Sequence, residues 1–139
     1  MVRALVGGGI LTPEGVRKGH AVVYGERIEG VVREEDLGGG LERQDAGGCW
    51  ICPGFVELHV HGARGADTMD ATPEALDTMA QFLATTGVTS FLATTMTLPL
   101  PQVVAALEAV RAAMGRPPTG ARLLGAHLEG PFIDPAHRG

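Results

Sequence analysis

The sequence is poor in several residue types, and each shortage excludes a class of protein. Aromatic residues make up only 4% of the 139 residues, too few for the stacking platforms that bind single-stranded nucleic acid. Acidic residues outnumber basic ones, 16 to 11, and the formal net charge is −5. This balance argues against nucleic acid and against anionic membrane surfaces. We therefore expect neither as a partner.

Long hydrophobic runs are also missing. No apolar stretch approaches the roughly 20 residues of a membrane span. The N-terminal segment is interrupted by Gly7, Gly8 and Gly9 and does not have the continuous apolar run of a signal peptide. A cytoplasmic location is the resulting expectation. Hydrophobic residues nevertheless make up 45% of the sequence, so the chain is globular and long enough to bury a sizeable core.

The two cysteines, Cys49 and Cys52, form a Cys-x-x-Cys pair. Such a pair is either a redox couple or half of a zinc site. Redox pairs of this kind sit at the N-terminus of a helix, whereas this pair runs into Pro53 and an apolar strand. On a strand, thiols three residues apart face opposite ways. We interpret both as structural thiols.

The pattern of the chain changes near residue 50. Residues 1–50 predict short β-strands with tight turns, including a hairpin whose two-residue turn is Gly25-Glu26. Residues 33–45 are charged and glycine-rich, which predicts a loop or a weak edge strand. From residue 51 onward, apolar strands alternate with helical patterns, at 53–62, 72–86, 88–95, 99–114 and 121–129. This β-α-β-α-β order predicts a parallel sheet with both faces covered.

The two helical patterns have clear limits. Thr72, Pro73 and Glu74 predict a helix start, and Gly87 predicts a left-handed end. A buried face is predicted for Leu76, Met79, Ala80 and Leu83. In the second helix the predicted apolar stripe is Val103, Val104, Leu107, Val110 and Met114, ended by Gly115.

Histidines and one glutamate follow two of the strands. His59 and His61 are spaced i, i+2, so they point to one face at the end of the first barrel-type strand. Glu129 ends the third strand, and parallel strands bring their carboxyl ends to one edge, where α/β barrels place their chemistry. Two histidines and one carboxylate suit a first-row divalent metal with open positions, and such ions activate water near neutral pH. The alternative is histidines hydrogen-bonded to backbone and an ion-paired carboxylate.

Other polar residues lie near this edge. His127 shares a face with Glu129. It either orients Glu129 without binding the metal itself, or is packed among other side chains without such a role. Arg64, Asp67 and Asp70 fall in the loop after the first strand, where they contact a polar substrate or are solvated. Thr94, Thr95 and Thr97 end the second strand, where they line a pocket or satisfy backbone groups.

These motifs together resemble a known family. The run from Pro53 to Gly62, PGFVELHVHG, is similar to the first-strand motif of the amidohydrolase superfamily. Within it, Gly65–Asp70 and His127–Phe132 resemble the N-acetylglucosamine-6-phosphate deacetylase family, as do the N-terminal strands. The resemblance extends over essentially the whole chain, but only to the N-terminal part of such enzymes. Glu57 stands where the family usually has aspartate.

The resemblance implies a fold and an activity. The fold is an N-terminal β-sandwich segment, residues 1–50, followed by the first β-α-β-α-β of an incomplete (β/α)8 TIM-type barrel, residues 51–139. The activity is metal-dependent hydrolysis of N-acetylglucosamine-6-phosphate to glucosamine-6-phosphate and acetate. Glu129 matches a metal ligand, and His59 and His61 match a pair present in members that hold two metals. One or two ions of zinc, iron, manganese or cobalt are implied, and a homo-oligomer, a dimer in the family.

Some of the family's groups have no counterpart in these 139 residues. They are the aspartate that acts as base and then acid, two further histidine ligands and the phosphate-binding groups. The only lysine is Lys18, so no carboxylated lysine can bridge two metals. We expect the chain alone to have no deacetylase activity and no catalytic residue of its own. Its apolar sheet edge would cause self-association or incomplete order. Two alternatives stay open: another amidohydrolase, acting on a cyclic amide or other N-acyl group, and a non-catalytic metal-binding or assembly module.

Overall fold

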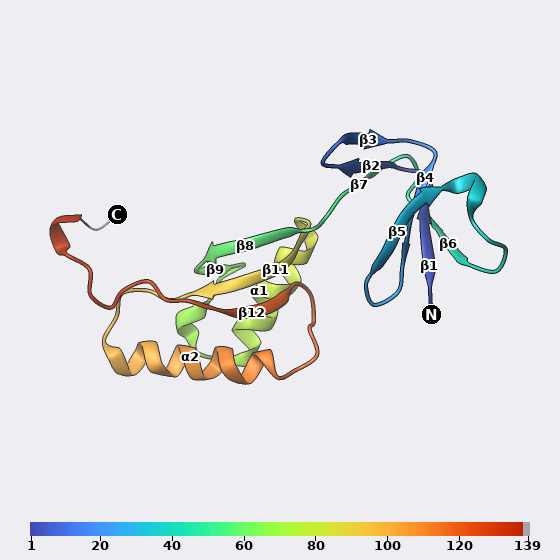
Figure 1. Ribbon diagram of the computed structural model, residues 1–139. Helices are drawn as coiled ribbons and strands as arrows, with labels where there is room; N and C mark the ends of the chain where they lie inside the picture. Colours follow the sequence, from blue (N-terminus) through green and yellow to red (C-terminus); the bar gives the residue numbers. More distant parts are fainter. Residues whose placement is uncertain (138–139) are drawn as a thin grey trace. The chain divides into compact units, whose positions relative to one another are not determined.

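The computed structural model describes residues 1–137, and its contacts divide the chain into two compact units. The first unit is Met1–Pro53, and the second begins at Gly54. Figure 1 shows the elements of both units along the chain. In the part of the chain that the structure describes, no helix has the length and apolar character needed to cross a bilayer.

The first unit is built from short strands arranged in two sheets. One sheet has the order β5-β4-β1-β6 and the other β3-β2-β7. The elements are β1 (Arg3–Val6), β2 (Gly9–Thr12), β3 (Gly15–Arg17), β4 (His20–Tyr24), β5 (Ile28–Arg33), the 3-10 turn Glu34–Asp36, β6 (Glu42–Asp45) and β7 (Trp50–Ile51). A small core forms around the buried Ala4, Ala21 and Leu37.

Two details of this unit bear on the sequence-based expectations. β6 is a short, exposed strand at the edge of its sheet, as the charged segment 33–45 suggested. The hairpin between β4 and β5 is longer than predicted, because Tyr24 pairs with Ile28 and three residues lie between them. The predicted two-residue turn is therefore wrong: the Gly25 amide donates to the Arg27 carbonyl, and a register shift after Val23 absorbs the extra residue.

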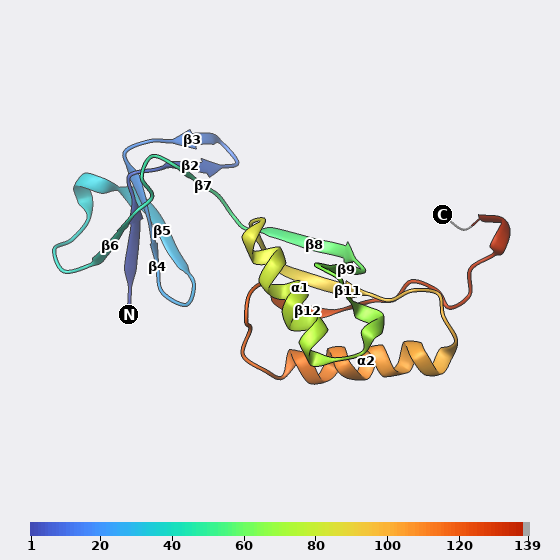
Figure 2. The same ribbon diagram turned by 180° about the vertical axis from the view of Figure 1, so that it is seen from behind.

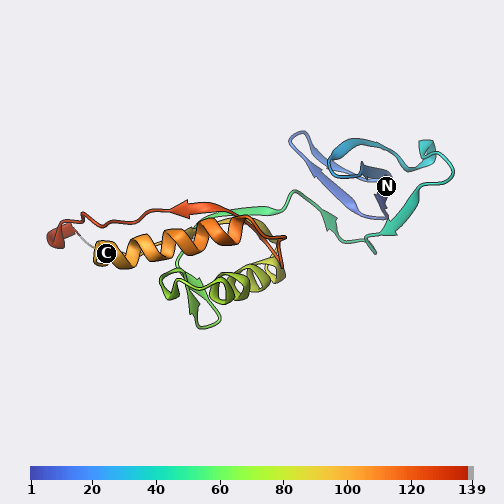
Figure 3. The ribbon, with the colours of Figure 1, turned by 90° about the horizontal axis from the view of Figure 1, so that it is seen from below.

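The second unit has the predicted alternation of strands and helices. Its main sheet has the order β12-β11-β8, and both pairs are parallel. The elements are β8 (Phe55–Val60), β9 (Gly62–Ala63), β10 (Ala66–Asp67), the 3-10 turn Thr68–Asp70, α1 (Pro73–Thr85), β11 (Val88–Thr94), α2 (Leu100–Met114), β12 (Arg122–His127) and the 3-10 turn Pro135–His137. Figures 2 and 3 show α1 and α2 on the same side of the sheet.

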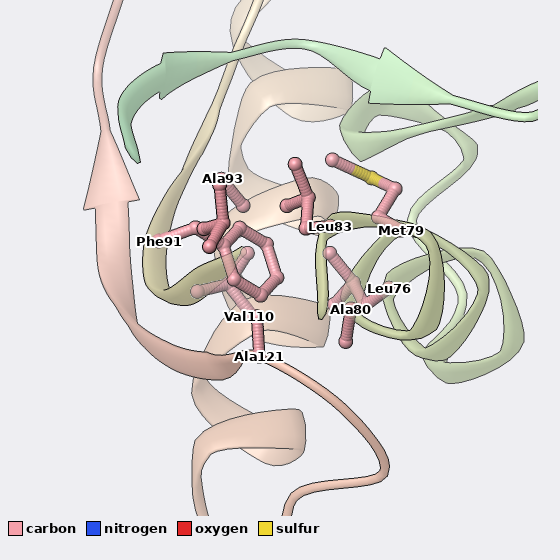
Figure 4. Close-up of a cluster of buried hydrophobic side chains, with 9 residues drawn as sticks. Leu76, Met79, Ala80, Leu83, Phe91, Ala93, Val110 and Ala121 are labelled. Carbon is pink, nitrogen blue, oxygen red and sulfur yellow. The ribbon is translucent and has the colours of Figure 1, made fainter. Parts of the chain in front are cut away.

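Helix α1 begins and ends where the sequence predicted. Thr72 is its N-cap, and its side-chain oxygen accepts a hydrogen bond from the Ala75 amide at 3.2 Å. Gly87 follows the helix with a φ of 85°, a conformation that glycine adopts without steric cost. The buried face of α1 packs with Phe91 and Val110 into the main core (Figure 4). The buried side chains of α1 thus hold the helix against the central strand, β11.

Two burial predictions for this unit are wrong. Strand β8 is not covered on both faces: Phe55, Val56 and Leu58 are all more than half exposed. The reason is that β8 lies at the sheet edge, while α1 packs on β11 and α2 on β12. On α2, Val104 and Met114 are also exposed, and Ala106 is buried together with Val103 and Val110. The prediction is therefore confirmed at Val103 and Val110 and wrong at Val104 and Met114.

Candidate metal centre

The parallel sheet brings His59, His61 and Glu129 to one edge. His59 is on β8 and His61 follows its last residue, whereas Glu129 lies two residues beyond the end of β12. β8 and β12 are not neighbours, since β11 lies between them, and strands two apart are separated by roughly 9.6 Å. The side chains close this gap, since His59 Nε2 and Glu129 Oε2 lie 3.1 Å apart.

The three side chains converge on one point. His59 Nε2 lies 3.1 Å from Glu129 Oε2, and His61 Nε2 lies 3.4 Å from the same oxygen. The two Nε2 atoms are 3.2 Å apart. These three residues are the group of His, Cys, Asp or Glu side chains that meets the spacing of a metal site among the described residues.

The spacing of these atoms fits a divalent metal ion. With bonds of about 2.1 Å, neighbouring ligand atoms lie about 3.0 Å apart at octahedral angles and about 3.4 Å apart at tetrahedral angles. The observed separations of 3.1, 3.2 and 3.4 Å fall in this range. Imidazole and carboxylate donors together suit zinc, iron, manganese or cobalt.

The same geometry also permits a metal-free arrangement. A protonated His59 or His61 would form a charge-assisted hydrogen bond with Glu129. The three side chains are between 32% and 48% exposed, so water reaches them from one side. His61 Nδ1 is buried without a hydrogen-bond partner among the described residues, whereas metal-binding histidines usually donate this second N–H to an acceptor.

His127 contacts the site through His59. Its Nδ1 lies 2.8 Å from the Leu58 carbonyl oxygen, and its ring meets the His59 ring edge-on, with centroids 4.6 Å apart. Within residues 1–137 no hydrogen bond joins His127 to Glu129. The contacts of His127 therefore lead to the histidine pair rather than to the carboxylate.

The charged residues of the loop after β8 have structural contacts. Part of the loop forms the β9–β10 hairpin, which the sequence pattern did not predict. Asp67 and Asp70 form a reciprocal capping box on the turn that follows, and the Arg64 guanidinium lies 5.1 Å from the centre of the Phe82 ring. None of these three side chains belongs to the cluster at the strand ends.

Glu57 supports the cluster and was not recognised as such from the sequence. Glu57 Oε1 accepts a hydrogen bond from the His59 amide at 3.0 Å. Thr94 and Thr95 hydrogen-bond to backbone groups of the strands on either side. Side chains two residues apart on a strand lie on the same face, so the spacing of positions 57, 59 and 61 could have identified Glu57 as a neighbour of the histidines. Satisfying backbone groups was one of the two roles expected for these threonines, and their hydrogen bonds confirm it.

Cys49 and Cys52 are exposed and free.

Curated proteins that are similar to this chain are named as deacetylases of amino-sugar phosphates. The chain is 45% identical over 89 residues to N-acetylglucosamine-6-phosphate deacetylase of Vibrio furnissii, covering 64% of this chain and 22% of that protein. The Bacillus subtilis (strain 168) enzyme of the same name is 47% identical over 92 residues, 64% of this chain and 23% of that protein. The chain matches the N-terminal part of the N-acetylglucosamine-6-phosphate deacetylases.

Solved structures of such deacetylases have the same fold. A Pasteurella multocida N-acetylglucosamine-6-phosphate deacetylase superposes with a TM-score of 0.88 at 28% identity, covering 98% of this chain and 36% of that one. A Thermotoga maritima deacetylase gives 0.74 at 34% identity, with 98% and 34% covered. A D-hydantoinase, at 19% identity and a TM-score of 0.52, shares the fold alone.

These matches bear out the predicted fold class. The β-rich unit followed by β-α-β-α-β is the opening of the deacetylase architecture, an N-terminal β-domain and a (β/α)8 barrel. The matched segment spans about a quarter of the length of the curated deacetylases. No protein-family model matches the chain.

Proposed function

We propose that the chain supplies the first strands and a metal-binding set of an N-acetyl-amino-sugar-6-phosphate deacetylase. In this proposal residues 51–139 are the first portion of the barrel and residues 1–50 its β-rich companion segment. The observation behind the proposal is the convergence of His59 Nε2, His61 Nε2 and Glu129 Oε2 within 3.4 Å of one another, in a chain similar to these deacetylases.

The proposed reaction is hydrolysis of the N-acetyl amide, which gives acetate and the free amine of the sugar phosphate. A divalent metal held by the three side chains supplies Lewis-acid polarisation of the carbonyl and activation of water. The carboxylate of Glu129 contributes negative charge that favours a cation, and the two imidazoles bind through neutral nitrogens. His127 holds the ring of His59 by its edge contact.

The identity of the sugar is proposed from the names of the related proteins alone. A relative from Escherichia coli O157:H7, named N-acetylgalactosamine-6-phosphate deacetylase, is 43% identical over 89 residues. This value is close to those for the two relatives named N-acetylglucosamine-6-phosphate deacetylase. We propose N-acetylglucosamine-6-phosphate because more of the matched proteins carry that name. A charged sugar phosphate also suits the cytoplasmic location expected from the sequence.

Metal content is the direct test of the site. Elemental analysis of the purified chain and of Glu129→Ala should find near-stoichiometric divalent metal in the first and a loss of it in the second. Glu108→Ala, an exposed glutamate on α2, is the matched control and should retain the metal. Absence of metal from the unaltered chain, or its retention in Glu129→Ala, would contradict the proposal and favour the ion-paired arrangement.

Acetate release tests the activity separately. The chain alone should release no acetate from N-acetylglucosamine-6-phosphate, because the groups that the family uses for proton transfer and phosphate binding have no counterpart in it. Activity in the isolated chain would show that its own residues complete the site. A metal-loaded chain without acetate release agrees with the proposal.

A further inference from the structure

The central strand of the sheet contributes none of the three converging atoms, yet two buried threonines end it. Thr94 is the last residue of β11, and Thr95 follows it. Both are 0% exposed, and Thr68 is the other buried polar residue in the described part of the chain. Buried hydroxyl groups are costly unless they are hydrogen-bonded, so the partners of these two side chains show what they do.

Thr94 holds the strand that carries the histidines. Its Oγ1 accepts a hydrogen bond from the Val60 amide at 2.9 Å. Val60 lies between His59 and His61 in the chain, so this bond fixes the backbone at the centre of the histidine pair. The strand ladder between β11 and β8 is irregular at this point, and the side chain of Thr94 takes the place of a backbone acceptor.

Thr95 holds the segment that carries the glutamate. Its amide donates to the His127 carbonyl at 3.0 Å, and its Oγ1 accepts from the Glu129 amide at 3.1 Å. The hydroxyl also lies 3.5 Å from the Glu129 carbonyl oxygen, to which it donates. The ladder between β11 and β12 ends at His127. The threonine side chain therefore extends the register of the two strands to Glu129.

We infer that Thr94 and Thr95, the threonine pair, are positioning residues that align the donor atoms of β8 and β12. One hydroxyl acts on each flanking strand, so the distance between the histidines and the carboxylate depends on two side chains that belong to neither. Neither threonine belongs to the group of side chains that converge at the strand ends. The expected effect on metal binding rests on the proposed metal site. The expected effect on the Val60 and Glu129 amides does not.

Isosteric substitution separates the hydroxyl from the bulk of each side chain. Thr94→Val and Thr95→Val remove the hydroxyls, whereas Thr94→Ser and Thr95→Ser keep them. Thr68→Val is the matched control, because Thr68 is equally buried and its hydroxyl has no partner among the described residues. Each variant of the full chain is titrated with Co2+, whose visible absorption reports both affinity and coordination geometry.

The second readout does not depend on a metal. Hydrogen–deuterium exchange, resolved to single amides by fragmentation mass spectrometry, follows the Val60 and Glu129 amides in the metal-free chain. Loss of a hydrogen-bond acceptor should speed exchange about tenfold at the affected amide. Val60 should respond in Thr94→Val and Glu129 in Thr95→Val, each without the other.

The expected result is a loss of Co2+ affinity of about 10- to 100-fold in each valine variant, the range typical of partners that orient metal ligands. The absorption bands should change shape, the serine variants should restore both properties, and Thr68→Val should match the unaltered chain. Unchanged affinity and spectra in both valine variants would overturn the inference. If the unaltered chain binds no Co2+, the proposed metal site fails, and amide exchange alone decides: site-specific acceleration supports the threonine pair, and unchanged exchange rejects it.

Discussion

His59 and His61 bring their Nε2 atoms within 3.2 Å of each other, although same-face residues on a strand are separated by about 6.8 Å along the backbone. The rings reach this distance by turning their edges inward, with an interplanar angle of 80° and centroids 5.0 Å apart. Glu129 Oε2 lies 3.1 Å from His59 Nε2 and 3.4 Å from His61 Nε2, so the three donor atoms surround one point.

Removing either ring should abolish tight metal binding. His59→Ala and His61→Ala each leave two donors, and we expect affinity losses greater than the roughly 10–100-fold that changing an outer partner causes. Equilibrium dialysis against zinc measures the loss. His20→Ala is the control, because His20 lies in the first unit and contacts the Lys18 carbonyl. Equal zinc binding by all three variants would show that these histidines are not ligands.

The N-cap of α1 should contribute measurably to the stability of the second unit. Thr72→Ala removes the acceptor for the Ala75 amide and should lower the free energy of unfolding by about 1 kcal/mol. Urea unfolding followed by far-UV circular dichroism reports on this unit, since both described α-helices belong to it. Thr72→Ser keeps the acceptor and should unfold at nearly the original midpoint. An alanine variant as stable as the serine variant would contradict the capping role.

Phe91 should be the most sensitive core position. It is fully buried between β11 and the two helices (Figure 4), and Phe91→Ala should cost about 3–5 kcal/mol through lost burial and the cavity left behind. That cost is comparable to the whole stability of a small domain, so the helical signal should melt at a much lower temperature. Phe132→Ala is the control, because Phe132 is 96% exposed. A similar midpoint for both variants would place Phe91 outside the core.

Periodicity and capping signals were enough to predict the elements of the second unit. Thr72 and Gly87 mark α1 correctly because caps are local: each depends on a few neighbouring residues. The convergence of His59 with Glu129 was also predictable, since parallel strands share their carboxyl edge.

What the sequence did not predict depends on tertiary context. Arg64 has a φ of 56° in the tight β9–β10 turn, a conformation usually signalled by asparagine or glycine. The exposure of β8 follows from its place at the sheet edge, which periodicity does not report. The hydrogen bonds of Thr94 and Thr95 join residues 34 positions apart. A local sequence pattern cannot predict contacts between residues so far apart in the chain.

Strand β8 should cause the chain to self-associate. Among the described residues, β8 and β12 each pair with β11 alone, so each has one unpaired edge. The β8 edge is also apolar: Phe55 is 65% exposed and Leu58 59%. Exposed apolar edge strands pair with other chains. Size-exclusion chromatography should therefore show elution that shifts earlier as the loaded concentration rises.

A charge on that edge should reverse the effect. Lysine is a residue with which natural proteins protect edge strands, so Leu58→Lys should move the chain toward the monomer position at every concentration. Val104→Lys makes the same charge change on an exposed position of α2, 43% exposed, and should leave association unaltered. If both lysine variants dissociate equally, the net charge of −5 rather than the edge governs association. A chain that elutes as a monomer at all concentrations without any substitution would show that β8 is protected as it stands.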